Sequence, residues 1–204
     1  SVPALSTTAS ITFNSLPDSL NEFNESVTID ISVGANATEG SSDGANVERE
    51  TITIVDNDAV PVVTLSVGST SVSEAGVSTT VTATSTAPAG RDVTINLVTS
   101  GTTVAADFTL AGSMVISALG TATTTTLSIV NDTLDEDGTV PIANETVVID
   151  ISGVTNGTEG SSDGSGTEQE TVTIVDDDAL PTVTFTFTPT TVFEDSTAST
   201  TATV

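Results

Sequence analysis

The 204-residue sequence predicts an all-β protein made of tandem antiparallel β-sandwich domains, and three observations support this prediction. Apolar residues alternate with Thr and Ser along many short segments, which is typical of strands with one buried face. Turn-forming groups that contain Gly, Pro, Asn or Asp separate these segments. A long stretch of the chain also repeats itself at a fixed offset, and no segment has the 3.6-residue apolar spacing of a helix.

Residues 60–180 carry the clearest alternation. The alternating apolar positions are Val63, Leu65 and Val67; Val93, Ile95 and Leu97; Leu127 and Ile129; Val147, Ile149 and Ile151; and Val172 and Ile174. About seven strands in about 120 residues is the size of one β-sandwich. Because only 3% of the residues are aromatic, we expect an aliphatic core with a few Phe.

The internal repeat sets the expected domain boundaries. Residues 24–61 and 144–181 are identical at 25 of 38 positions, with no gap and a constant offset of 120. A period of this length suits a whole domain. We therefore expect residues 1–59 to be the C-terminal half of one repeat, 60–180 to be a complete repeat, and 181–204 to be the N-terminal strands of the next. The chain then resembles a window of a longer array; alternatively, its two partial ends complete each other between molecules.

The charge balance excludes several classes of function. The chain has 28 acidic and 2 basic residues, a net charge of −26, and no His, Cys, Trp or Tyr. Arg49 and Arg91 cannot form a basic surface for nucleic acid or anionic lipid. The usual ligands of zinc, haem and iron–sulfur clusters are absent, and so is the base of a catalytic triad. No stretch approaches the roughly 18–20 apolar residues of a membrane span.

Carboxylate chemistry remains, and the acidic residues gather where strands end. In the complete repeat these residues are Glu74, Asp107, Asp132, Asp135, Glu136, Asp137, Glu145, Asp176, Asp177 and Asp178. Carboxylates that converge at one end of a sandwich repel each other unless they are protonated or bridged by a cation. Ca²⁺ takes six to eight oxygen ligands and accepts irregular geometry, so we expect a calcium site here. The alternative is that the acidic loops are only solvated.

Five segments, in this order, resemble the motifs of Calx-β domains. They are residues 71–76, 101–108, 129–132, 144–147 and 172–178, which cover the whole complete repeat. The family's Asp-Tyr pair is Asp107-Phe108 here, which keeps the ring and loses the hydroxyl group. The resemblance implies a seven-stranded immunoglobulin-like sandwich with calcium at one pole, as in the regulatory domains of sodium–calcium exchangers and in repeats of large surface adhesins.

The resemblance also implies a ligand set. In the complete repeat the implied ligands are Glu74, Asp107, Asp132, Glu145, Asp176, Asp177 and Asp178; in the partial first repeat they are Asp18, Glu25, Asp56 and Asp58; and in the third it is Glu194. Calcium would be the cofactor in every case. Because a carbohydrate-cleaving pair of carboxylates usually works beside aromatic sugar platforms, and Trp and Tyr are absent, we do not expect an enzyme.

These observations predict a calcium-stiffened structural repeat array of an extracellular adhesin or surface fibre, located outside the cell or on its surface. Its expected partners are neighbouring repeats of the same chain or other copies of it, with no nucleic acid and no membrane insertion. Two alternatives stay open: a calcium-sensing regulatory domain, and a self-assembling filament subunit joined by strand complementation.

Overall fold

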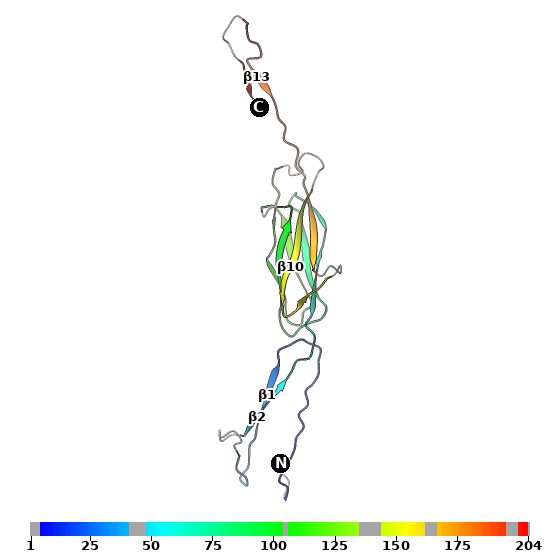
Figure 1. Cartoon of the computed structure of the whole chain (residues 1–204), viewed down its shortest axis with the longest axis vertical. Helices are drawn as coiled ribbons and strands as arrows, with labels where there is room; N and C mark the ends of the chain where they lie inside the picture. Colours follow the sequence, from blue (N-terminus) through cyan, green and yellow to red (C-terminus); the bar gives the residue numbers. More distant parts are fainter. Residues whose placement is uncertain are drawn as a thin grey trace.

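The protein is all-β, with one β-sandwich between two smaller two-stranded units. The computed structural model describes residues 5–40, 48–103, 106–134, 144–161, 167–194 and 200–203. Figure 1 shows the sandwich at the centre of an elongated molecule, with one two-stranded unit toward each end of its long axis. Within these described ranges, no helix is long and apolar enough to cross a membrane.

The sandwich consists of two five-stranded sheets. The first sheet contains, in spatial order, β4 (Ser71–Ser73), β12 (Gln169–Val175), β10 (Glu145–Thr155), β6 (Val93–Gly101) and β8 (Ser113–Ile116). The second contains β11 (Thr158–Glu159), β3 (Val62–Val67), β5 (Ser78–Ser85), β9 (Ala122–Ile129) and β7 (Phe108–Thr109). The prediction of an all-β sandwich is thus confirmed, with short strands in addition to the seven expected.

The core is aliphatic and follows the predicted alternation. Val63, Val81, Ile95, Leu127 and Ile149 are all fully buried, and their sequence neighbours on the same strands face outward or lie partly covered. Met114, the single Met of the chain, and the partly buried ring of Phe108 complete the packing. One buried face per strand explains why Thr is common at the intervening positions.

Two edge pairings differ from the expected antiparallel arrangement. β4 pairs in parallel with β12, with Val72 opposite Ile174, and β11 pairs in parallel with β3. After β3 the chain leaves the second sheet, turns at residues 68–70, and joins the edge of the first sheet as β4. Both parallel strands are only two or three residues long, too short to show a periodicity in the sequence.

The two smaller units are β1 (Glu25–Asp30) with β2 (Arg49–Ile54), and β13 (Thr186–Thr188) with β14 (Thr201–Thr203). β1 and β2 are the counterparts of β10 and β12 and pair in the same register. Their environment differs, because in the described part of the chain no second sheet covers them. Ile29 is 38% exposed, whereas its counterpart Ile149 is 0% exposed.

A buried glutamate joins the two sheets at the start of β12. Glu168 is 0% exposed, and its Oε1 accepts a hydrogen bond of 2.8 Å from the backbone N–H of Leu65 in β3. Its own N–H donates to Oε1 of Glu159 at 2.7 Å. Because a buried carboxylate without such bonds is costly, Glu168 must stay close to β3 for the sandwich to close. This role of Glu168 has no signal in the sequence, where it is one more acidic residue beside an acidic loop.

Matched substitutions in the repeat test which isoleucine contributes to folding. Ile149→Ala should lower the free energy of unfolding by about 2–5 kcal/mol, because it removes a fully buried side chain and leaves a cavity. Ile29→Ala should change it by less than roughly 1 kcal/mol, because Ile29 is already exposed to water. Urea denaturation of both variants measures the difference, and equal losses would contradict the packing described above.

Glu170 predicts a pH dependence of stability. Burial and, secondly, the negative charge of Glu168 raise the pKa of Glu170 above its ordinary value of 4.5. Folding therefore favours the protonated form, so the stabilising contribution is present below pH 4.5 and is lost as the pH rises through the raised pKa. Glu170→Gln should raise the unfolding free energy at pH 7 and have no effect near pH 4. Glu50→Gln, at the matching position of β2, is the control; a gain that is the same at both pH values would refute the assignment.

Candidate metal centre

The parallel pairing of β4 with β12 brings Glu74 to the end of the sandwich where β12 stops. The N–H of Glu74 donates to the carbonyl of Val175 at 2.9 Å, directly before Asp176. The chain then turns through Gly76, which has a φ of 79°, a conformation that glycine adopts without strain. Glu74 is only 2% exposed, so this turn places its carboxylate inside the end of the sandwich.

The residues directly after β12 form a tight turn that is held by a side chain within the turn. The N–H of Asp178 donates to Oδ1 of Asp176 at 3.1 Å. The other oxygen, Oδ2 of Asp176, is buried and accepts no hydrogen bond from any residue that the structure describes. Asp177, between them, is exposed. A buried carboxylate oxygen without a partner is costly, and a cation is one way to satisfy it.

Asp132 completes the cluster from the other sheet. It follows β9, and its Oδ1 accepts a hydrogen bond of 2.7 Å from the N–H of Leu134. One carboxylate oxygen each from Glu74, Asp132 and Asp178 lie within 4.8 Å of one another. The three residues come from segments that are far apart in the sequence, so the tertiary fold creates the cluster. We call these three residues the carboxylate cluster.

Asp107 and Glu145 lie at the same end of the sandwich. Asp107 precedes β7, which pairs with the end of β9, and its carbonyl accepts from the N–H of Val130 at 2.7 Å. Glu145 begins β10, opposite Ile174 near the end of β12. Asp107 is buried and Glu145 is half-buried, so both acids are partly withdrawn from water beside the carboxylate cluster.

Gly101 shapes the loop that carries Asp107. Its φ is 125°, and a Cβ atom at this position would lie 2.0 Å from the carbonyl oxygen of Thr146. Only glycine allows β6 to end so close to the start of β10. The glycine that opens residues 101–108 therefore has a physical reason, which is the close approach of two backbones near the cluster.

The geometry of the carboxylate cluster suits a hard cation. Carboxylates this close repel each other, and a bound cation or a proton removes the repulsion. Oxygens at about 2.3–2.6 Å from a calcium ion can be up to about 5 Å apart across it, which matches the spacing here. With no His or Cys in the chain, the donor set is oxygen only.

Three further predicted ligands have a different standing. Asp135 and Asp137 lie outside the described residues. Glu194 is exposed in the C-terminal segment, and the described part of the chain places no group of three acidic residues around it. Of the acids named from the sequence, the structure brings Glu74, Asp132 and Asp178 together, and the sequence could not say which three converge.

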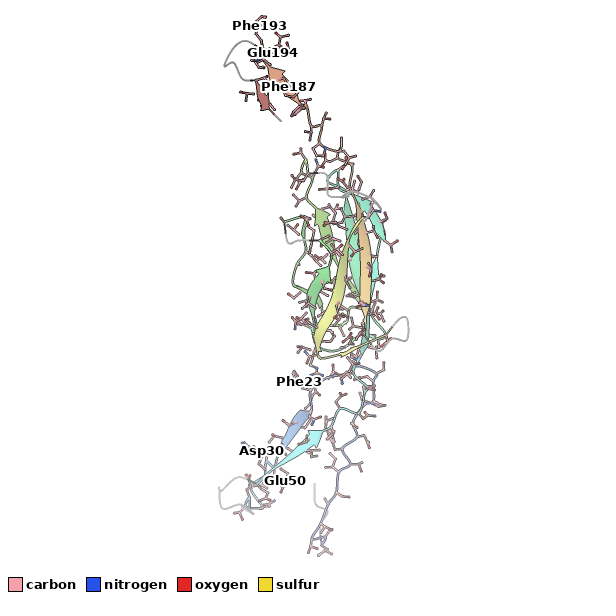
Figure 2. All side chains as sticks on the ribbon, turned by 45° about the horizontal axis from the view of Figure 1, so that its top comes forward. Phe23, Asp30, Glu50, Phe187, Phe193 and Glu194 are labelled. Carbon is pink, nitrogen blue, oxygen red and sulfur yellow. The ribbon has the colours of Figure 1, made fainter. Side chains whose placement is uncertain are left out.

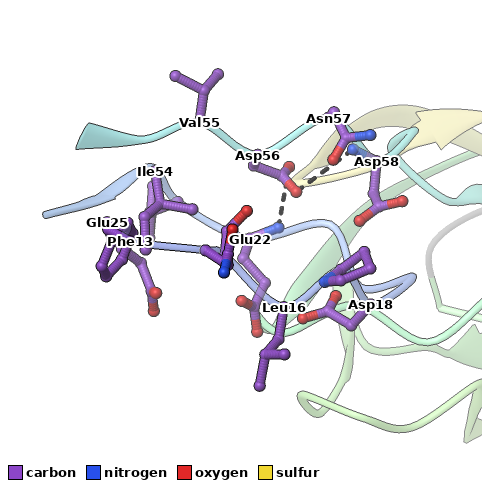
Figure 3. A pocket seen from close by; sticks show the side chains of 14 residues that line it. Phe13, Leu16, Asp18, Glu22, Glu25, Ile54, Val55, Asp56, Asn57 and Asp58 are labelled. Atoms are coloured by element: carbon purple, nitrogen blue, oxygen red, sulfur yellow. Dashed lines mark hydrogen bonds between the residues drawn. The ribbon is translucent and has the colours of Figure 1, made fainter. Parts of the chain in front are cut away.

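The acids of the partial first repeat line a different feature. Asp18, Glu25, Asp56 and Asp58 lie around an open hollow of ≈ 340 Å³ beside the start of the sandwich, and Glu22, which was not predicted, lines it as well (Figure 3). Apolar side chains, among them Phe13, Leu16 and Phe23, line the rest of the hollow. In the described chain these acids do not form a group that meets the geometry of a metal site.

Asp56 and its counterpart Asp176 have different partners. Oδ2 of Asp56 accepts a hydrogen bond from Nδ2 of Asn21 at 3.0 Å. It also accepts one from the N–H of Glu22 at 3.2 Å, and Oδ1 accepts one from the N–H of Asp58 at 3.4 Å (Figure 3). Both oxygens are therefore satisfied by the protein. At Asp176 one oxygen is bonded in this way and the other is not. Two motifs that differ only by Asn57 in place of Asp177 thus leave a carboxylate oxygen available in one copy and not in the other.

A junction that the sequence analysis missed lies between the first hairpin and the sandwich. Asn21 is 6% exposed, and its side chain also donates to the carbonyl of Asp58 at 3.1 Å. A guanidinium nitrogen of Arg91 donates to Oδ1 of Asn21, and the guanidinium lies 4.4 Å from the ring centre of Phe23. The signal available in the sequence was the small number of cations. It does not identify the contact, because Arg91 has many possible partners in so acidic a chain.

Comparison with known proteins finds similarities to solved structures only. No protein-family model and no curated protein matches the sequence. The similarity to CBD12 from CALX1.2 spans 53% of this chain and 41% of the CBD12 chain, with 17% sequence identity and a TM-score of 0.43. The apo form of the Calx CBD1 domain is 18% identical over 57% of this chain and 98% of that one, also with a TM-score of 0.43. A two-domain protein of unknown function from Bacteroides fragilis is 14% identical over 57% and 46% of the two chains, with a TM-score of 0.37.

Arg91→Ala should loosen the hairpin relative to the sandwich. The substitution removes the hydrogen bond to Asn21 and the contact with the ring of Phe23, each of which crosses the junction. We expect ¹⁵N relaxation to report faster independent motion of β1 and β2, with the melting temperature of the sandwich almost unchanged. Arg49→Ala makes the same charge change but removes an exposed 2.9 Å ion pair with Asp30 inside the hairpin, and should leave the relaxation unaltered.

Proposed function

We propose that the carboxylate cluster binds Ca²⁺ and that this protein is a calcium-stiffened structural repeat array. The observation that carries the proposal is the convergence of Glu74, Asp132 and Asp178 within 4.8 Å. Strands of both sheets lead to this point, so a bound cation would tie the sheets together where the chain leaves the sandwich.

The donor set favours calcium over other metals. Zinc sites use His and Cys, which this chain lacks. Magnesium requires near-octahedral geometry and usually keeps several waters, whereas calcium accepts irregular sets of carboxylates at six to eight positions. Besides the three clustered carboxylates, the buried Oδ2 of Asp176 is available, and Asp107 and Glu145 stand at the same end. The resemblance of the motifs to Calx-β domains supports the same ion.

The position of the site supports a structural role. Asp178 is followed by only two residues before Pro181, where the next segment of repeat-like sequence begins. Proline fixes φ at this point and limits the freedom of the connection. A cation held by Asp178 would therefore stiffen both the end of the sandwich and the start of the linker. Near-copies of one domain in tandem suit a spacer better than a single regulatory switch.

The wider setting is part of the proposal. An array of this kind would serve as an extracellular adhesin or surface fibre, with neighbouring repeats or other copies of the chain as its partners. Millimolar extracellular calcium would load even sites of modest affinity. A ligand that binds only the folded state stabilises it by about 2.7 kcal/mol at 100 times its dissociation constant.

Calcium titration tests the proposal directly. Isothermal calorimetry should detect Ca²⁺ binding, and Ca²⁺ should raise the melting temperature relative to EGTA. Glu74→Gln and Asp178→Asn should each weaken the affinity by roughly 10–100-fold or more, because each removes a charged ligand. Asp177→Asn changes the same charge in the same turn at an exposed side chain and should bind almost as tightly as the wild type.

The structural role has a separate readout. Small-angle scattering should show a longer maximum dimension with Ca²⁺ than with EGTA, since a stiffer linker keeps the chain extended. No binding heat and identical melting in both conditions would refute the calcium site. Binding without any change of dimension would refute the stiffening role while leaving the site in place.

A further inference from the structure

The side chain of Asn21 is a buried amide that joins three parts of the chain. It is 6% exposed and lies between the β1–β2 hairpin and the sandwich. Its Nδ2 donates to Oδ2 of Asp56 at 3.0 Å and to the carbonyl of Asp58 at 3.1 Å. Its Oδ1 accepts a hydrogen bond from the guanidinium of Arg91. An amide has two N–H donors and one acceptor oxygen, so only one orientation of this side chain satisfies all three partners.

The main chain beside Asn21 also docks on the sandwich. Asn21 forms a parallel bridge with Ala89, in the loop before β6, and its carbonyl accepts a hydrogen bond of 3.1 Å from the N–H of Gly90. A Cβ atom at Gly90 would lie only 2.6 Å from Cγ of Glu22, so glycine permits this close approach. Figure 2 shows Phe23 at the point where the hairpin meets the sandwich. Main-chain and side-chain contacts therefore act at the same point of the junction.

The protein itself neutralises the acids at this junction. Glu22, Asp56 and Asp58 line one hollow here, and acids that gather in this way repel each other (Figure 3). Arg91, one of only two cations in a chain with a net charge of −26, is held beside them by its bond to Asn21. Hydrogen bonds and a fixed positive charge thus do here what a bound cation would do at the carboxylate cluster.

The second copy of the repeat does not carry these residues. At the offset of 120, the counterparts of residues 21–23 are residues 141–143, with the sequence Pro-Ile-Ala. This sequence offers no side-chain amide, carboxylate or aromatic ring. The Oδ2 atom of Asp176, at the acidic exit of the same copy, is buried and accepts no hydrogen bond from any described residue. The two copies therefore differ in how they satisfy the acids that follow their last strand.

We propose that Asn21 is a positioning residue that holds the β1–β2 hairpin at a fixed angle to the sandwich without a bound cation. Relative motion of two units is the default when their interface is small and polar, so specific bonds are needed to suppress it. The chain then has junctions of two kinds. The junction at Asn21 keeps its geometry at any calcium concentration, whereas the linker after Asp178, which rests on the proposed function, stiffens only when the carboxylate cluster is loaded.

Asn21→Asp isolates the contribution of the amide. It keeps the size of the side chain but replaces the two N–H donors with an oxygen that faces Oδ2 of Asp56 and the carbonyl of Asp58. Repulsion then takes the place of two hydrogen bonds, and a cation becomes necessary to bridge these oxygens. Asn57→Asp is the matched control, because it adds the same charge at an exposed side chain of the neighbouring turn.

Electron–electron double resonance across the junction tests the proposal. The chain contains no Cys, so nitroxide labels can be attached at Thr53→Cys in β2 and Val115→Cys in β8, where both side chains are exposed. With Asn21 in place, the distribution of distances should be equally narrow in EGTA and in excess Ca²⁺. With Asn21→Asp, it should be roughly twofold broader in EGTA, because the two units regain independent motion. Excess Ca²⁺ should narrow it again, and Asn57→Asp should match the parent chain.

Asn21→Ala supplies a second variant. It removes all three side-chain bonds without adding a charge, so its distribution should be broad in EGTA and stay broad in Ca²⁺. The melting temperature of the sandwich should be the same in every variant, because Asn21 and Asn57 lie outside its core. A parent chain that broadens in EGTA would overturn the proposal, and so would Asn21 variants as narrow as Asn57→Asp. Because the comparison is made in EGTA, this outcome is independent of calcium binding at the carboxylate cluster.

Discussion

The parallel pairing of β4 with β12 is the interaction on which the rest of the structure depends. It moves the chain from one sheet to the other directly after β3, which closes the sandwich with very few residues. It also anchors Glu74 to the carbonyl of Val175, immediately before the acidic turn that contains Asp178. Without this pairing the two carboxylates would belong to separate loops, and the cluster with Asp132 would not exist.

Much of the sandwich could be predicted because a half-buried strand has a period of two residues. Val93, Ile95 and Leu97 alternate in the sequence and are all buried in β6. The parallel edge strands could not be predicted, because strands of two or three residues carry no period. The burial of Glu168 was equally hidden, since only its hydrogen bond to a distant strand distinguishes it from a solvated acid.

The candidate site shows the same limit. The sequence indicated that acids gather at strand ends, and Glu74, Asp132 and Asp178 were among those named. It could not distinguish Asp176 from Asp56, which has nearly the same sequence context but bonds to Asn21 and Glu22 of the preceding segment. Matching residues of the two copies thus differ in chemistry because different neighbours reach them. The Arg91 junction was missed for this reason as well, since a single cation has no pattern.

The direction of β4 relative to β12 also determines how the sandwich responds to mechanical tension. The chain enters through β3 and β4 and leaves through β12, so pulling on the two ends drags these parallel neighbours past each other. The hydrogen bonds between them, such as those from Glu74 to Val175 and from Thr173 to Thr70, then resist together in shear and do not open one after another. A cation between Glu74 and Asp178 would clamp this pair of segments where the load leaves the domain. Under such tension, the short edge strand would carry the load between the two ends of the sandwich.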